Sequence, residues 1–272
     1  MAQDNSDKGT EVVKLPEWRG KLKKGEPKSG LIILTGLAKS GKSTLGASWP
    51  DSVVLELEKG GADRISGRIA EVGDLKQFRS VLRAAIEDEK VKTVVVDTID
   101  ALSDLLEHEV AEAAGLEDIT QRKAGVDGFS VWGAYRSKIE GFVAYARASG
   151  KLFLLLAHNK EPKLDSNGTL VSPAGIQIPG KSGLYLAAQA DAIGNMYKKP
   201  IGGITRYFLS FQGGPLGAYG SRIEELEDKT VELPKDSPYS AFAALFTQPE
   251  AKAEMKVKKQ EDKVPAGAGR RS

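Results

Sequence analysis

The segment LIILTGLAKSGKST, residues 31–44, constrains this chain more than any other feature. Five mostly apolar residues precede Gly36, and the eight residues from Gly36 to Ser43 fit the pattern G-x4-G-K-[ST]. The apolar run predicts a buried strand, and the residues after the pattern predict a short helix that ends before Pro50. Because a phosphate-binding loop needs this strand–loop–helix setting, the sequence predicts such a loop here.

Each position of the loop has a chemical task. Gly36 and Gly41 let consecutive backbone N–H groups point at a phosphate. Lys42 offers an ammonium to the β- and γ-phosphates of a nucleotide, the Ser43 hydroxyl is a ligand for Mg²⁺, and the helix N-terminus adds its dipole. Lys39 is not required by the pattern, and we expect it to be a second phosphate contact, in its own subunit or across an interface. The predicted nucleotide-binding residues are Gly36, Leu37, Ala38, Lys39, Ser40, Gly41, Lys42, Ser43 and Thr44.

Apolar strands alternate with amphipathic helices along the rest of the chain. Strands are predicted at 31–35, 52–58, 93–97 and 152–157, and helices at 74–89, 100–114 and 131–149. This alternation predicts βαβ units and a mostly parallel sheet with helices on both faces. Residues 190–199 and 205–211 predict an antiparallel pair, followed by a helix at 237–246. The segments 115–129 and 158–183 are expected to be loops.

Composition limits the remaining possibilities. The 272 residues contain no cysteine, which excludes disulfides, cysteine zinc sites and thiol nucleophiles. No apolar run reaches the roughly 20 residues of a membrane helix, and the polar N-terminus lacks the apolar region of a signal peptide, so we expect a cytoplasmic protein. Breaker-rich and charged ends suggest a polar tail at 1–28, a core at 29–248 and a second tail at 249–272.

The two tails are basic although the whole chain carries a net charge of only +2. Residues 1–30 hold seven Lys or Arg against five acids, and residues 251–272 hold seven against three, which leaves −4 on the middle of the chain. Basic arms can contact the phosphate backbone of a nucleic acid. Solvated, disordered ends are the alternative interpretation.

Two carboxylates are candidates for chemistry beside the loop. Asp97 ends the strand at 93–97, where it would support Mg²⁺ through water; alternatively it only caps the next helix. Glu58 ends the second predicted strand and is the candidate that activates water, with an ordinary surface glutamate as the alternative. Glu56 points the same way by strand alternation but lies deeper.

The fourth predicted strand ends in LLLAHNKEP, where His158 or Asn159 is placed to sense a γ-phosphate and to relay its loss to the following loop. A satisfied structural histidine is the competing interpretation. The same segment lacks the final Asp of the guanine-reading N-K-x-D pattern, because Pro162 stands there. This difference counts against a GTPase. The sequence also contains no LSGGQ-like stretch, which counts against an ABC ATPase.

Several segments, in order, carry a resemblance: GLAKSGKST, VVLELEKGGADRI, TVVVDTID, the run from VWGAYRSKIE to LLLAHNKE, and GAYGSRIEEL. Over residues 29–248 they resemble the RecA-like ATPases of bacteriophages, a group of single-strand annealing and recombination proteins. The resemblance implies a RecA-like P-loop NTPase core that binds ATP at residues 36–44, with Asp97 supporting Mg²⁺ and Glu58 polarising the attacking water. His158 and Asn159 would occupy the position of an Asn-Gln pair that couples the nucleotide to DNA.

The resemblance also implies partners. Residues 160–181 and 115–129 would match the second and first DNA-binding loops, although the second loop has no aromatic ring to stack on bases. Single-stranded DNA, further copies of this chain in a ring or filament, and a phage or host single-strand-binding or annealing protein are the expected partners. A cation from a neighbouring subunit would complete the site, with Arg222 and Lys181 as candidates and Arg206 as a weaker third.

The sequence therefore predicts an Mg²⁺-dependent, DNA-stimulated ATPase that binds single-stranded DNA in phage recombination, annealing or replication. Two alternatives stay open. One is a P-loop phosphotransferase that acts on a small acceptor, although no compact arginine cluster suggests its usual lid. The other is a nucleotide-gated module, which is non-enzymatic and in which bound nucleotide switches the interaction with a protein partner.

Overall fold

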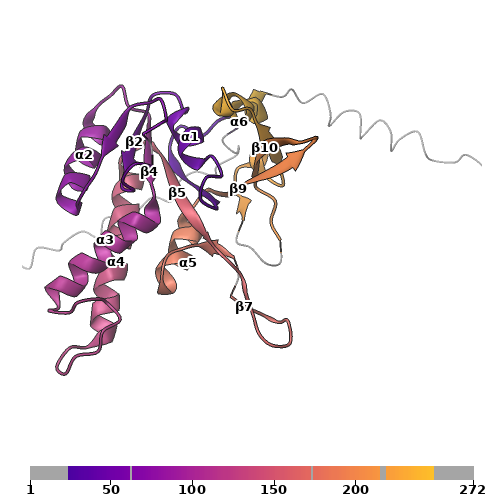
Figure 1. The fold of residues 1–272 in the computed structure, drawn as a ribbon. Helices are drawn as coiled ribbons and strands as arrows, with labels where there is room; N and C mark the ends of the chain where they lie inside the picture. Colours follow the sequence, from indigo (N-terminus) through magenta and orange to yellow (C-terminus); the bar gives the residue numbers. More distant parts are fainter. Residues whose placement is uncertain (1–23, 62, 173, 215–218, 248–272) are drawn as a thin grey trace, which may run out of the picture.

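The computed structural model describes residues 24–61, 63–172, 174–214 and 219–247, and nearly all of both predicted tails lies outside them. A single large sheet forms the centre of the molecule, with helices on both faces (Figure 1). Its strands are β1 (Gly30–Gly36), β2 (Ser52–Glu56), β3 (Ile69–Glu71), β4 (Thr93–Asp97), β5 (Leu152–Lys160), β8 (Gly175–Ile176), β9 (Ala192–Ile201), β10 (Ile204–Ser210), β11 (Gly220–Ser221) and β12 (Thr230–Leu233). The helices are α1 (Lys42–Ala47), α2 (Leu75–Glu87), α3 (Ile99–Ala113), α4 (Gly128–Ala148), α5 (Gly180–Gln189) and α6 (Pro238–Thr247), with a 3₁₀ turn at Glu224–Leu226.

The strand order is β12-β10-β9-β1-β5-β4-β2-β3. The strands from β9 to β3 in this order are parallel to one another, whereas β10 and β12 continue the sheet in antiparallel pairing. The predicted fold class is therefore confirmed: a mostly parallel α/β core with antiparallel strands on its C-terminal side. Since β5 lies between β1 and β4, three strand ends meet at one edge of the sheet.

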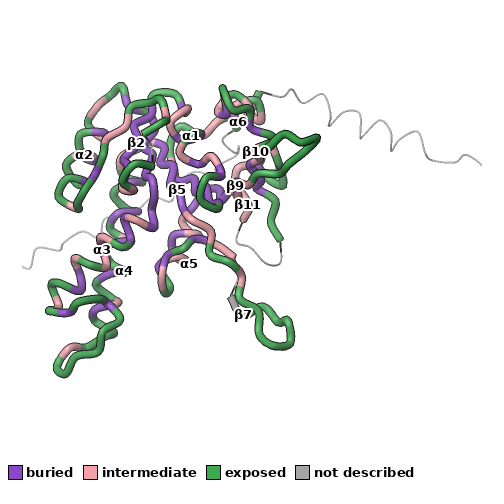
Figure 2. The backbone as a smooth tube through the Cα atoms, viewed as in Figure 1, coloured by how far each residue is buried: buried purple, intermediate pink, exposed green. Residues whose placement is uncertain are grey.

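Two apolar cores cover the two faces of the sheet. Side chains of α2, α3, α4 and α5 pack on one face, and the fully buried Tyr135 of α4 lies among them. On the other face α1 and α6 pack together, where the ring of Trp49 lies 4.5 Å from that of Phe242. The buried interior therefore follows the central strands, and exposure increases toward the loops (Figure 2).

Side-chain caps fix where three of the helices begin. Asp74 accepts a hydrogen bond from the backbone N–H of Gln77 at the start of α2, and Asp127 caps α4 in the same way. Thr98 caps α3 by accepting from the N–H of Ala101 at 3.3 Å. The cap on α3 matters for function because it places the first turn of that helix directly after Asp97.

Two sequence predictions are wrong in detail. The strand expected to end at Glu58 stops at Glu56, so Glu58 lies in the loop that follows β2. The segment 158–183 is not a simple loop: β5 continues to Lys160, β6 (Lys163–Leu164) and β7 (Leu170–Ser172) form a hairpin, β8 pairs back on β5, and α5 begins at Gly180. Such pairing between distant residues leaves no periodic signal in the sequence, and the short strands β3 and β12 were missed for the same reason.

Candidate nucleotide site

A cavity of about 660 Å³ opens at the carboxyl edge of the parallel strands. The predicted loop residues from Ala38 to Thr44 line it, together with Glu58, Asp97 and His158. Gly36 at the end of β1 is in register with His158 on β5, and Asp97 ends the next strand, β4. The order of the strands thus brings together chemical groups that lie more than 100 residues apart in the chain, at the edge where open α/β sheets bind ligands.

The loop itself is closely packed. A Cβ at Gly36 would lie 2.5 Å from the carbonyl oxygen of Met196, and Gly41 has a φ of 96°, so both positions favour glycine. The Lys42 side chain is buried, and its Nζ donates to the carbonyl oxygens of Gly36 and Leu37 at 2.9 and 3.1 Å. Lys39, also at positive φ, is exposed and lines the cavity. Its role as a second phosphate contact stays a prediction.

Charge and burial oppose each other next to this loop. Burial raises the pKa of Asp97 to about 6, while a hydrogen bond from the Ser43 side chain and the charge of Lys42 act in the other direction. Burial likewise lowers the pKa of Lys42, and the neighbouring charges of Asp97, Asp100 and Glu58 oppose that shift. A pocket of buried ionisable groups of both signs is typical of a site whose charges are completed by a ligand.

The residues present fit a magnesium nucleotide. Ser40 Oγ is buried without a hydrogen-bond partner among the described residues, so the loop holds a polar atom free to bind phosphate oxygen. Ser43 and Asp97 supply the hydroxyl and carboxylate oxygens that Mg²⁺ prefers. They would hold the ion, which when bound neutralises phosphate charge, and Lys42 would contact the phosphates.

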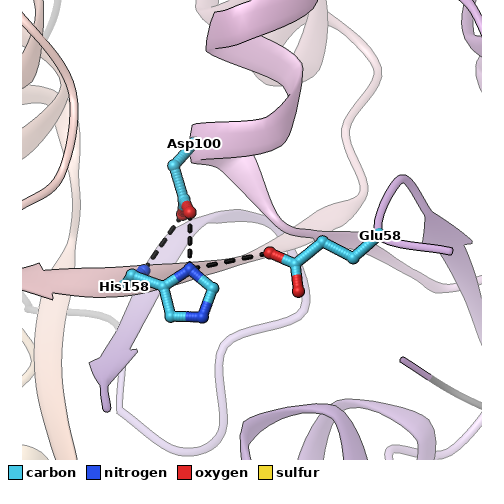
Figure 3. A group of neighbouring side chains, drawn as sticks. All are labelled: Glu58, Asp100 and His158. Carbon is cyan, nitrogen blue, oxygen red and sulfur yellow. Dashed lines mark hydrogen bonds and ion pairs between the residues drawn. The ribbon is translucent and has the colours of Figure 1, made fainter. Parts of the chain in front are cut away.

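Glu58 and His158 lie next to each other, with Asp100 beside His158 (Figure 3). One carboxylate oxygen of Glu58 accepts a hydrogen bond from the Thr98 hydroxyl at 2.8 Å and lies 3.6 Å from Nδ1 of His158. The same His158 nitrogen lies 2.6 Å from a carboxylate oxygen of Asp100. Glu58 is about two-fifths exposed and lines the cavity, so it is in a position to orient water there, as the sequence predicts.

The other predicted residues lie farther from the cavity. Asn159 donates from Nδ2 to Oδ1 of Asn195 on β9, and its own Oδ1 is buried without a partner among the described residues. Lys181 is exposed in the first turn of α5. Arg222 donates to the carbonyl of Ala188 beyond the amino end of β9, at the opposite edge of the sheet from the loop, and Arg206 pairs with Glu232. A role for any of these cations in a neighbouring subunit stays a prediction.

The second wall of the cavity is not predicted by any sequence pattern. Apart from one lysine it is apolar and aromatic, and it comes from β9, β10, the end of β12 and the start of α6: Met196, Tyr207, Leu233, Pro234, Lys235 and Pro238. Lys235 Nζ lies 5.9 Å from the centre of the Tyr207 ring. This wall adjoins the loop, because a Cβ at Gly41 would lie 3.4 Å from the Tyr207 ring and 3.8 Å from Cε of Met196. Such a wall suits the flat face of a base. The antiparallel strands were predicted, but their alignment against β1 could not be.

Comparisons with known proteins agree with this geometry. A family model described as AAA domain (AAA_24) matches residues 30–223, more than half of the chain. The chain belongs to this AAA domain family. Its members are P-loop ATPase domains, so the residue pattern of 36–43 and the fold have a common explanation. A comparison with curated proteins finds no match.

Solved structures show more distant likeness. The flagellar accessory protein FlaH from Methanocaldococcus jannaschii is 12% identical, with a TM-score of 0.37, and the match covers 75% of this chain and 84% of FlaH. The KaiC-like protein PH0186 from Pyrococcus horikoshii OT3 is also 12% identical, with a TM-score of 0.41 and coverage of 75% and 85%. Likenesses of this size carry no inference about activity.

No helix among the described residues is long and apolar enough to cross a membrane.

Proposed function

We propose that this AAA domain protein is an Mg²⁺-dependent ATPase that binds single-stranded DNA and acts in phage recombination, annealing or replication. One observation carries the proposal: Glu58, Asp97 and His158 meet the phosphate-binding loop at one cavity, and the strand that bears His158 continues into an exposed hairpin. Strand β5 would thus take part both in ATP hydrolysis and in the response to single-stranded DNA.

Hydrolysis is supported by the division of tasks in the cavity. Lys42 and Ser43 lie where phosphates and the metal would bind, Asp97 is the buried carboxylate beside them, and Glu58 is the more exposed acid with access to water. A general base needs that access, whereas a metal-supporting carboxylate needs fixed geometry. The two acids differ in burial in the way that these two roles require.

Single-strand binding is supported by two exposed segments. The hairpin after β5 has exposed residues from 163 to 171, including Leu164 and Val171. The segment 115–127 leads into α4, where the Phe129 ring is 92% exposed and follows Arg122 and Lys123 in the chain. Exposed rings and cations in one segment are the combination that stacks bases and contacts phosphates in single-strand binders, and the first segment carries both.

The test is the rate of ATP hydrolysis by the full chain, with Mg²⁺, alone and with single-stranded DNA, double-stranded DNA or RNA at two salt concentrations. We expect the greatest stimulation with single-stranded DNA, weakening as salt rises. Binding to the same DNA is measured in parallel by fluorescence anisotropy. Hydrolysis without any response to or binding of nucleic acid would refute the DNA function, and turnover that requires a small acceptor would favour a phosphotransferase.

A further inference from the structure

Asp100 is a buried carboxylate that no step above uses. It is the second residue of α3 and only 9% exposed, yet it does not cap its own helix, because Thr98 has that role. Both of its oxygens turn instead to β5. One accepts from the backbone N–H of His158 at 3.0 Å, and the other lies 2.6 Å from Nδ1 of the same residue.

The contact with Nδ1 orients the His158 ring, and the contact with the N–H holds its backbone. Because an ionised carboxylate only accepts hydrogen bonds, this contact is a hydrogen bond to ionised Asp100 when Nδ1 carries the hydrogen. Nε2 then points away from Asp100, as Figure 3 shows, and His158 is among the residues that line the nucleotide cavity. Asp100 thus holds the backbone of His158 with one oxygen and its ring with the other.

The far side of His158 is connected to the hairpin. Its carbonyl oxygen accepts from the N–H of Gln177 at 3.1 Å, and the next residue, Asn159, pairs with Ile176 of β8. The residues of β8 immediately follow the β6–β7 hairpin in the chain. A displacement of His158 would therefore move the base of the hairpin through backbone hydrogen bonds rather than through flexible side chains.

We propose that Asp100 is a positioning residue: it holds His158 against the nucleotide cavity and thereby couples the bound nucleotide to the β6–β7 hairpin. The inference rests on the proposed nucleotide function but requires no DNA. A purely structural ion pair would stabilise the fold equally with and without nucleotide. A coupling element makes the hairpin respond to nucleotide, and this response is what the experiment measures.

Trypsin cleavage after Lys163, which is exposed in the hairpin, reports that response. The cleavage rate of the full chain is measured without nucleotide, with Mg²⁺ and ADP, and with Mg²⁺ and a non-hydrolysable ATP analogue. We expect the analogue to change the rate severalfold in the unmodified protein. In Asp100→Ala the rate should no longer depend on nucleotide, while the affinity for the analogue, measured by titration, stays within about threefold.

Three further variants make the test decisive. Asp100→Asn keeps one acceptor for the His158 backbone N–H but turns its NH2 group to Nδ1, which forces the ring hydrogen onto Nε2; it should therefore lose most of the response even if Asp100→Ala folds poorly. Asp104→Asn, an exposed acid one turn further along α3, should keep the full response. In His158→Ala, adding Asp100→Ala should change nothing more.

Two results would overturn the inference: an unmodified protein whose hairpin cleavage ignores nucleotide that it demonstrably binds, or additive effects of Asp100→Ala and His158→Ala. The proposed function fails differently, by the absence of any DNA binding or DNA-stimulated turnover. The two failures are therefore distinguishable, because trypsin cleavage is measured without DNA.

Discussion

The nucleotide edge of the sheet and the two exposed segments differ in burial. At the nucleotide edge, less than a tenth of each of Lys42, Asp97 and Asp100 is exposed. In the exposed segments, Phe129 is 92% exposed and Leu164 is 52% exposed. At the nucleotide edge, buried charges are held by neighbouring polar groups and the geometry is fixed by strand order. In the segments 115–129 and 161–171, by contrast, most side chains face solvent. The first region is built for chemistry on a small ligand, and the second has free surface for a large one. If this division is correct, variants in one region should leave the function of the other intact.

The largest effect is expected for Glu58→Gln. Because the amide cannot accept a proton, kcat for ATP hydrolysis should fall by about 10²–10⁴-fold, while affinity for ATP and for single-stranded DNA stays unchanged. Steady-state hydrolysis and nucleotide titration measure the two quantities separately. Glu87→Gln, at the exposed end of α2, is the matched control and should keep full turnover. Unchanged turnover in Glu58→Gln would remove Glu58 as the base and favour the nucleotide-gated module.

Asp97→Asn should raise the free energy of unfolding of the nucleotide-free protein while abolishing Mg²⁺-dependent nucleotide binding. The pKa of Asp97 rises from 3.8 to about 6 on folding, so ionised Asp97 costs the folded state about 3 kcal/mol above pH 6. This cost is absent below about pH 4 and grows as pH rises between the two values. The gain from Asp97→Asn should therefore be near its maximum at pH 7–8 and disappear at pH 4.

Denaturant unfolding at pH 4, 7 and 8 measures this dependence, with the exposed Asp63→Asn as the control. A stability difference that does not change with pH would show that burial does not raise the pKa of Asp97. The nucleotide edge would then lack the buried, destabilising carboxylate that distinguishes it from the exposed segments.

The smallest of the three effects is expected for Phe129→Ala. Loss of one stacking ring should weaken single-stranded DNA binding by about 1–3 kcal/mol, and basal ATP hydrolysis should not change. Tyr145→Ala on the same helix removes another exposed ring and should leave DNA affinity intact. Fluorescence anisotropy at constant salt measures both. Equal losses in the two variants would mean that DNA does not select the 115–129 segment, and the comparison between the two regions would lose its second half.

Local patterns in the sequence were enough to predict the phosphate-binding loop, the parallel core and the helices α2, α3, α4 and α6. They depend on neighbouring residues: an apolar run, a glycine that permits positive φ, or apolar residues at helical spacing. The patterns also pointed to Asp97, Glu58 and His158, because each follows an apolar strand. They failed at the hairpin and α5, where β8 pairs with β5 across 14 intervening residues.

Residues 31–44 by themselves determined that this protein has a phosphate-binding loop, since the loop's chemistry is contained in consecutive backbone N–H groups and one lysine. Only the tertiary structure decided what surrounds it. The order of the strands places β5 between β1 and β4, and that order brings His158 to Asp100 and Glu58, and Tyr207 to the cavity beside the loop. Strand order is set by burial of both faces of the whole sheet, a property of the complete chain that no local pattern contains.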